Sequence, residues 1–156
     1  MLLRSLVAGI HYLALALGLA SVYARGLRLR RLRRAPQDGE ALAALFRADA
    51  AWGVAALLWI ATGLPRLFGG LEKASEFYLR NGFFYTKMGL FALVLVLELL
   101  PMVTFIRWRK AQRTAAGAPV AGAPLGTLIR LNDLEVAVVI LIPFVAALMV
   151  RGAWLF

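Results

Sequence analysis

Long apolar runs separated by short polar segments dominate the pattern of this chain. Four runs stand out, at about 5–24, 50–68, 83–106 and 134–150. Each is close to the ~17–25 residues with which a helix crosses ~30 Å of hydrocarbon. Because a backbone in lipid must satisfy its hydrogen bonds within its own segment, the runs predict helices rather than strands. The pattern therefore predicts an all-α fold, a membrane four-helix bundle that forms one integral domain over residues 1–156.

The composition agrees with a membrane location. Hydrophobic residues make up 62% of the chain, charged residues only 17%, and the mean hydropathy is +0.78. Soluble domains average about 45–50% apolar and about 25% charged residues. The segments between the runs are too short for a soluble domain, so any chemistry belongs in or beside the lipid. Cysteine is absent, which excludes disulfides, thiolate catalysis and a zinc site built from Cys and His.

The first run has a second interpretation as a removable signal over residues 1–24. The stretch "LGLASVYA" ends with Val22 and Ala24 at positions that suit a signal peptidase. Against this, only Arg4 precedes the run, and "RGLRLRRLRR" follows it directly and would resist translocation. A retained membrane helix is the favoured interpretation.

Basic residues predict how the bundle is oriented. The segment 25–47 carries seven arginines, the segment 107–130 carries four arginines and Lys110, and together they hold 12 of the 18 basic residues. By the positive-inside rule both are basic cytoplasmic loops, while 69–82 is an outer loop and both termini lie outside. This predicts a multi-pass membrane protein with both termini outside the cytoplasm. The net charge of +10 suits anionic lipid headgroups; nucleic acid is not expected as a partner, because the basic runs adjoin membrane spans.

Four ionisable residues fall within or near the apolar runs. With both termini outside, His11 lies ~9 Å and Lys87 ~6 Å below the outer end of their helices, and Arg66 closes the second helix on that side. Glu98 lies on almost the same helical face as Lys87 but ~16 Å deeper. A carboxyl there is expected to be protonated or partnered inside the bundle. Lys87 and Arg66 are also near enough to an interface for their charged ends to reach water.

The remaining polar residues have plainer interpretations. His11 is also compatible with a neutral histidine that bonds to a neighbouring helix. Three carboxyls are expected near the cytoplasmic ends of the second and fourth helices, where they would stabilise the helix dipole: Asp49, Asp133 and Glu135. Small residues that permit close helix approach are expected at Gly9, Gly18, Gly53 and Gly63. Such faces make a homo-oligomer or a larger membrane complex possible.

Several stretches together carry a family resemblance: "DAAWGVAALLWIATGLPRLF", "EFYLRNGFFYTKMGLF", "LLPMVTFIRWR" and "LIPFVAALMVRG". From His11 to Gly152 the chain resembles an uncharacterised family of bacterial four-helix membrane proteins, and the resemblance implies a location in the bacterial inner membrane. That family is distantly similar to the HemJ-type protoporphyrinogen oxidases and to the membrane domain of the CopD copper-resistance proteins. HemJ-type proteins have a histidine in the first helix and a lysine in the third, positions that correspond to His11 and Lys87.

The resemblance implies a haem b bound through the histidine and a part in oxidising a porphyrin precursor. HemJ-like sequences carry a second histidine about three turns after the lysine, where this chain has Glu98. They also have an Asn-Glu pair at the start of the fourth helix, where "RLNDLE" offers Asn132-Asp133 with shifted spacing, or Glu135. With one histidine in the whole chain, a separate copper or zinc site is not expected.

Two hypotheses follow. The first is a membrane oxidoreductase that holds haem b or a porphyrin in the outer half of the bundle. His11 would be the metal ligand, Arg66 would help to bind the cofactor, and Lys87 and Glu98 would be catalytic through proton transfer. The second is a non-catalytic membrane subunit or assembly factor that binds other membrane proteins through its buried polar and small-residue helix faces. A transporter is less favoured, because no internal repeat is present.

Overall fold

The computed structural model describes residues 1–69, 75–114, 120, 122–152 and 154 of the chain. It consists of four long helices and one short one: α1 (Leu2–Arg34), α2 (Gly39–Phe68), α3 (Ser75–Leu79), α4 (Gly82–Arg113) and α5 (Leu125–Val150). The four long helices are each long and apolar enough to cross a membrane. The prediction of an all-α bundle with four spans is therefore confirmed.

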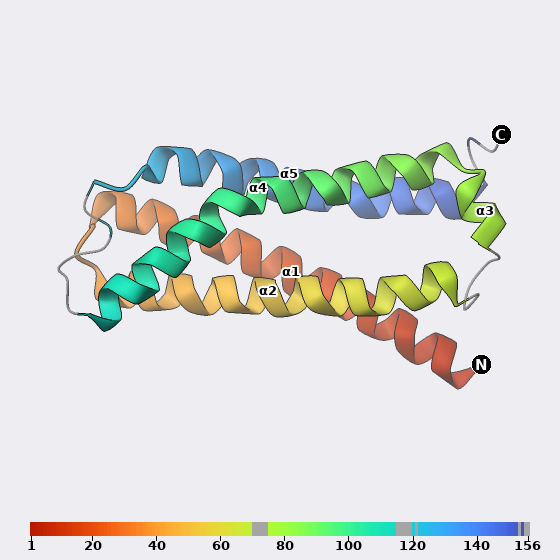
Figure 1. The fold of residues 1–156 in the computed structure, drawn as a ribbon, viewed down its shortest axis with the longest axis horizontal. Helices are drawn as coiled ribbons and strands as arrows, with labels where there is room; N and C mark the ends of the chain where they lie inside the picture. The colour runs from red at the N-terminus through yellow and green to blue at the C-terminus, as the bar shows by residue number, and fades with distance from the viewer. Residues whose placement is uncertain (70–74, 115–119, 121, 153, 155–156) are drawn as a thin grey trace.

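The long helices run alternately up and down (Figure 1). α1 packs along α2 and α5, and α4 packs along α5. The N-terminus, α3 and the end of α5 lie at one end of the bundle, and the ends of α1 and α4 lie at the other (Figure 1). We call these the α3 end and the basic end. Within this arrangement the first part of α1 diverges from the other helices toward the N-terminus (Figure 1).

The helices extend well beyond the apolar runs. α1 continues to Arg34, and Asp38 caps α2 by accepting a hydrogen bond from the Ala41 amide at 2.8 Å. Of the predicted loop 25–47, only residues 35–38 are therefore outside helices. In the same way, 107–113 belong to α4 and 125–130 to α5. The polar ends remain helical because arginine, leucine and alanine all favour helix, whether or not lipid surrounds them. Residues 70–74 of the predicted outer loop 69–82 lie outside the described part.

A proline changes the course of α4. Pro101 has no N–H for the helical hydrogen-bond ladder, and its ring crowds the preceding turn, so a helix commonly bends at such a residue. Beyond the middle of the bundle, α4 leaves α5 and crosses toward the first turns of α2 (Figure 1). This course brings Phe105 and Trp108 against Leu42 and Leu45.

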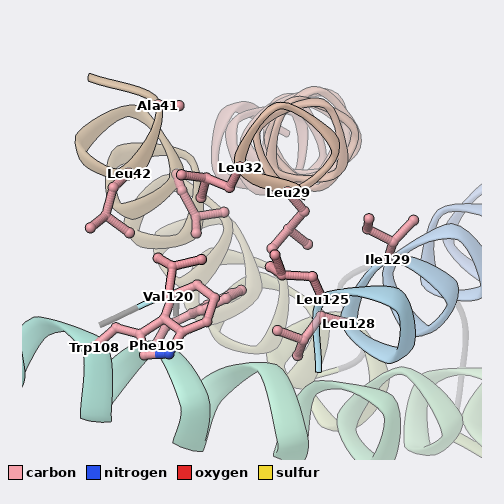
Figure 2. Close-up of a cluster of buried hydrophobic side chains, with 11 residues drawn as sticks. Leu29, Leu32, Ala41, Leu42, Phe105, Trp108, Val120, Leu125, Leu128 and Ile129 are labelled. Carbon is pink, nitrogen blue, oxygen red and sulfur yellow. The ribbon is translucent and has the colours of Figure 1, made fainter. Parts of the chain in front are cut away.

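Three apolar clusters fill the bundle. The first lies at the basic end, where side chains of α1, α2, α4 and α5 meet; Figure 2 shows Leu29, Leu32, Ala41, Leu42, Phe105, Trp108, Val120, Leu125, Leu128 and Ile129. The second, which we call the central apolar cluster, contains Ala14, Val22, Trp52, Trp59, Val94, Leu97, Val138, Val139 and Ile142. The third lies at the α3 end and contains Tyr78, Phe84 and Met149.

Only one of the four glycines expected at helix contacts is crowded. A Cβ added to Gly18 would lie 3.0 Å from the Trp52 ring, so α1 and α2 approach closely there. At Gly63 the added Cβ would make an ordinary contact of 3.7 Å, and at Gly9 and Gly53 it would meet nothing within 4 Å. The prediction is therefore right for Gly18, whereas Gly9 and Gly53 make no close approach to any other described residue.

Candidate functional site

A cavity of about 540 Å³ lies between the helices at the α3 end. Its wall includes His11 from α1, Trp59 and Arg66 from α2, and Lys87 from α4. The structure thus brings His11, Lys87 and Arg66, which the sequence placed on the same outer side, into the wall of one interhelical cavity. The volume falls within the ~300–1,000 Å³ typical of sites for small molecules and cofactors.

A short hydrogen-bonded chain defines how the His11 ring is held. His11 Nδ1 lies 2.8 Å from Thr62 Oγ1, and the Thr62 hydroxyl donates to the Leu58 carbonyl at 2.6 Å. Because the hydroxyl has only one proton and gives it to that carbonyl, its oxygen must accept from His11. His11 Nδ1 therefore carries a proton, and in the neutral ring the lone pair is on Nε2.

Aromatic side chains form much of the cavity wall. The rings of His11 and Trp59 are 6.0 Å apart, and those of Trp59 and Phe91 are 6.5 Å apart. Trp59 Nε1 is buried, and no acceptor for its N–H is found within the described residues. A buried donor without an acceptor costs free energy, so a polar group of a ligand in the cavity would stabilise the site.

Three basic side chains contribute to the cavity wall. Arg66 lies 5.7 Å from the Tyr12 ring centre, and Lys87 lies 5.8 Å from that of Phe84, both in cation–π contacts. Arg151, just after α5, also contributes to the wall. No aspartate or glutamate lines the cavity among the described residues. The combination of apolar walls and several cations suits an apolar molecule that carries anionic groups.

A second polar site lies inside the bundle and centres on Arg25 of α1. The Arg25 side chain is fully buried, and its Nη1 donates to both carboxyl oxygens of Glu98 at 2.8 Å. Its Nη2 donates to Glu135 Oε2, and its Nε donates to Asn132 Oδ1 at 2.9 Å. Asp49 Oδ1 is a weaker partner at 3.4 Å. The guanidinium is thus held by residues from α2, α4 and α5, and we call this set the Arg25 cluster.

The partners of Arg25 are themselves held in place. Trp52 Nε1 donates to Glu98 at 3.2 Å, and Arg109 Nη2 donates to Asp49 at 2.8 Å. Asn132 donates to the Val22 carbonyl at 3.2 Å. This contact requires α1 and α5 to approach closely, because a Cβ on the neighbouring Gly26 would lie 2.5 Å from Asn132 Nδ2.

Glu98 faces the bundle interior, as its depth predicts, but the sequence did not reveal its partner. Arg25 had been counted with the basic loop 25–47, and it lies instead within α1, away from lipid headgroups. A signal was available in principle, because Arg25 directly follows an apolar run and the other three long helices each hold a carboxyl. No rule of spacing connects residues so far apart in the chain.

The helix-dipole interpretation of three carboxyls is wrong. α2 begins at Gly39 and α5 at Leu125, so Asp49, Asp133 and Glu135 all lie well inside their helices. Asp49 and Glu135 instead bind Arg25, and Asp133 forms an exposed pair with Arg30 at 2.5 Å.

The two sites are separate. Trp59 and Ile142 of the central apolar cluster line the cavity, while Trp52 of the same cluster binds Glu98. Glu98 does not line the cavity, and it lies ~16 Å along α4 from Lys87. A proton path from Lys87 to Glu98 would have to cross this apolar layer. Over the described residues, no group of three or more His, Cys, Asp or Glu side chains is arranged to hold a metal ion.

Comparison with known families gives one match. The model of the family described as "Predicted membrane protein (DUF2214)" matches residues 3–153. The chain belongs to this family. The match extends over all four long helices, and it agrees with the multi-pass membrane architecture seen in the structure. No match to the chain was found among curated proteins or among solved structures.

Proposed function

We propose that this DUF2214 protein binds a porphyrin, haem b or a precursor of it, in the cavity at the α3 end and takes part in membrane redox chemistry. The observation that carries the proposal is the His11–Thr62–Leu58 chain. Histidines that ligate metals usually donate the other ring nitrogen to a neighbouring acceptor, which orients the ring and raises its basicity. Thr62 is such an acceptor, and it directs the lone pair of the neutral ring to Nε2.

The residues of the cavity wall also fit a porphyrin. A porphyrin is a largely apolar ring that carries carboxylates, and the wall combines aromatic side chains with Arg66 and Lys87. In the proposal His11 ligates the iron through Nε2, while Arg66 and Lys87 offset the charges of the propionates. A bound haem would supply one-electron transfer. The likeness of the sequence motifs to HemJ-type proteins gives the same assignment for His11 and Lys87.

Glu98 has no part in this proposal. It replaces the second histidine of HemJ-like sequences, but its carboxyl is bound by Arg25 and Trp52 and is not in the cavity wall. A haem in this cavity would therefore have His11 as its one histidine ligand, because the chain has no other histidine. Lys87 remains the candidate for proton transfer to or from a substrate at the cavity.

The test is an absorption spectrum with pyridine haemochrome analysis of the full chain purified from its native membrane. A Soret band is expected, and His11→Ala should abolish it. Thr62→Val keeps the shape of the side chain but removes the acceptor for His11, so haem affinity should fall about 10–100-fold. Thr104→Val is the matched control, because the Thr104 hydroxyl is exposed and bonds only to a carbonyl of its own helix.

Two results would overturn the proposal. One is a colourless protein that also fails to bind added haemin. The other is a Soret band that persists in His11→Ala, since the cavity geometry offers no second histidine.

A second candidate function, a non-catalytic subunit or assembly factor, is favoured by the first part of α1. This segment leaves the bundle (Figure 1) and exposes the apolar side chains of Leu2, Leu3, Leu6, Ile10 and Leu13. Lipid alone can cover such a surface, but so can a helix of another protein. A photo-crosslinking residue at Leu6 in the native membrane tests this: a discrete protein adduct supports the subunit function, and adducts with lipid alone contradict it.

A further inference from the structure

The Arg25 cluster contains more acidic groups than basic ones. Arg25 from α1 and Arg109 from α4 contact three carboxyls: Asp49 from α2, Glu98 from α4 and Glu135 from α5. Asn132 of α5 and Trp52 of α2 complete the cluster and are neutral. Arginine stays charged in proteins. If all three carboxyls were ionised, the cluster would therefore hold one net negative charge inside the bundle.

An uncompensated charge in a low-dielectric interior is strongly disfavoured, and a carboxyl commonly avoids it by taking up a proton. The three carboxyls differ in how many hydrogen-bond donors they have and in how exposed they are. Asp49 is bound by both arginines, and its side chain is 14% exposed. Glu98 receives two hydrogen bonds from Arg25 and one from Trp52, and its side chain is 19% exposed. Each of these two carboxyls therefore has two different side chains as donors.

Glu135 has the fewest donors of the three carboxyls and is the most deeply buried. Its side chain is 0% exposed, and only Oε2 has a donor, the Arg25 guanidinium. Oε1 is buried and has no hydrogen-bond partner among the residues described. Glu98 and Glu135 bind neighbouring nitrogens of the same guanidinium, Nη1 and Nη2, so two ionised carboxylates would lie close together there. A proton on Glu135 Oε1 would make that oxygen a hydrogen-bond donor and would neutralise the cluster.

We propose that the Arg25 cluster is a proton-binding site that holds one exchangeable proton on Glu135. The ligand is a proton from water: an O–H bond forms on Glu135 Oε1 on binding and breaks on release, with no change of oxidation state. The polar contacts lead outward from Arg25 through Asp49 to Arg109, whose side chain is 36% exposed. The central apolar cluster lies on the other side, toward the cavity. The site does not depend on haem binding.

The experiment is infrared difference spectroscopy of the full chain in lipid bilayers, titrated from neutral to alkaline pH. A protonated carboxylic acid gives a C=O stretch that an ionised carboxylate lacks and that shifts in D₂O. We expect such a band at neutral pH and its loss as the pH rises. Glu135→Gln should abolish the band, because the glutamine keeps the shape of the protonated side chain.

Glu98→Gln should also abolish the band, because it removes one negative charge and leaves the cluster neutral without a proton. Asp133→Asn is the control: Asp133 is two positions from Glu135, its pair with Arg30 is exposed, and the band should persist. Amide bands confirm that each variant keeps its helices. The proposal is overturned if the wild-type protein has no acid band at neutral pH, as a cluster that bound a metal cation instead would show. It is also overturned if the band survives in both glutamine variants.

Discussion

Arg25→Met removes the guanidinium that all four long helices share and keeps an unbranched side chain in its place. The change leaves Glu135 without its donor and Glu98 with only the hydrogen bond from Trp52, whereas Asp49 retains Arg109. Removing one partner of a buried ion pair costs about 3–5 kcal/mol, because the other partner is left as an uncompensated charge. Since Glu98 loses its buried cation and Glu135 loses the donor to its Oε2, we expect the free energy of unfolding to fall by about 3–5 kcal/mol.

The assay is reversible unfolding in mixed micelles, followed by the fluorescence of the chain's four tryptophans. Arg30→Met is the matched control, because Arg30 is 39% exposed and pairs with Asp133, which is 49% exposed. Exposed pairs contribute about 0–1 kcal/mol, so this variant should remain close to the wild-type protein.

A triple variant distinguishes the cost of the unpaired carboxyl groups from the loss of the Arg25 contacts. Adding Glu98→Gln and Glu135→Gln to Arg25→Met replaces both stranded carboxyl groups by neutral amides, and much of the lost stability should return. Neutral replacements of buried ion pairs are often tolerated, because no charge then has to be desolvated. The reasoning fails if the free energy of unfolding of Arg25→Met lies within about 1 kcal/mol of the wild-type value. It also fails if the triple variant is no more stable than Arg25→Met.

Three further predictions concern the packing, the ends of the helices and the orientation. Gly18→Val should lower the free energy of unfolding by about 1–3 kcal/mol, as overpacking does, because even a Cβ would lie 3.0 Å from the Trp52 ring; equilibrium unfolding measures this. The hydrogen bond from the Ala41 amide lowers the pKa of Asp38. The stability that the ionised Asp38 carboxylate contributes is therefore complete above the pKa of Asp38 in the unfolded chain, and it is lost as the pH falls through the lower pKa of Asp38 in the folded protein. Asp38→Ala should therefore reduce stability near neutral pH and flatten the acid side of a stability–pH profile. A cysteine at Gln37, the first in this chain, should not react with an impermeant thiol reagent in intact cells, because the positive-inside rule places this turn in the cytoplasm.

Each of these predictions has a matched control. Gly53→Val adds the same side chain at a position with nothing within 4 Å of the new Cβ, and it should cost little. Asp38→Asn keeps a capping oxygen without the charge, so it should retain the helix cap and lose the pH dependence. A cysteine at Glu76 in α3 should react in intact cells. If the cysteine at Gln37 reacts and the one at Glu76 does not, the orientation is reversed.

The sequence by itself determined the number of spans. Four apolar runs of membrane-crossing length leave the backbone no other regular structure, because hydrogen bonds in lipid must close within a segment. The alternation of the helices then follows from chain connectivity, and it placed His11, Arg66 and Lys87 at one level. Their common level could be predicted because depth along a helix is set by residue number alone. The common cavity depends in addition on which helix faces pack together.

The tertiary structure alone decided which polar groups meet. From the sequence, Arg25 was grouped with the other arginines of a basic segment, because a charged side chain just after an apolar run ordinarily contacts water or lipid headgroups. In the fold it is buried, because Glu98 and Glu135 converge on it from two other helices and Asn132 occupies the space beside Gly26. The free energy of a buried charge depends on the partners around it in space, and no pattern along the chain records that.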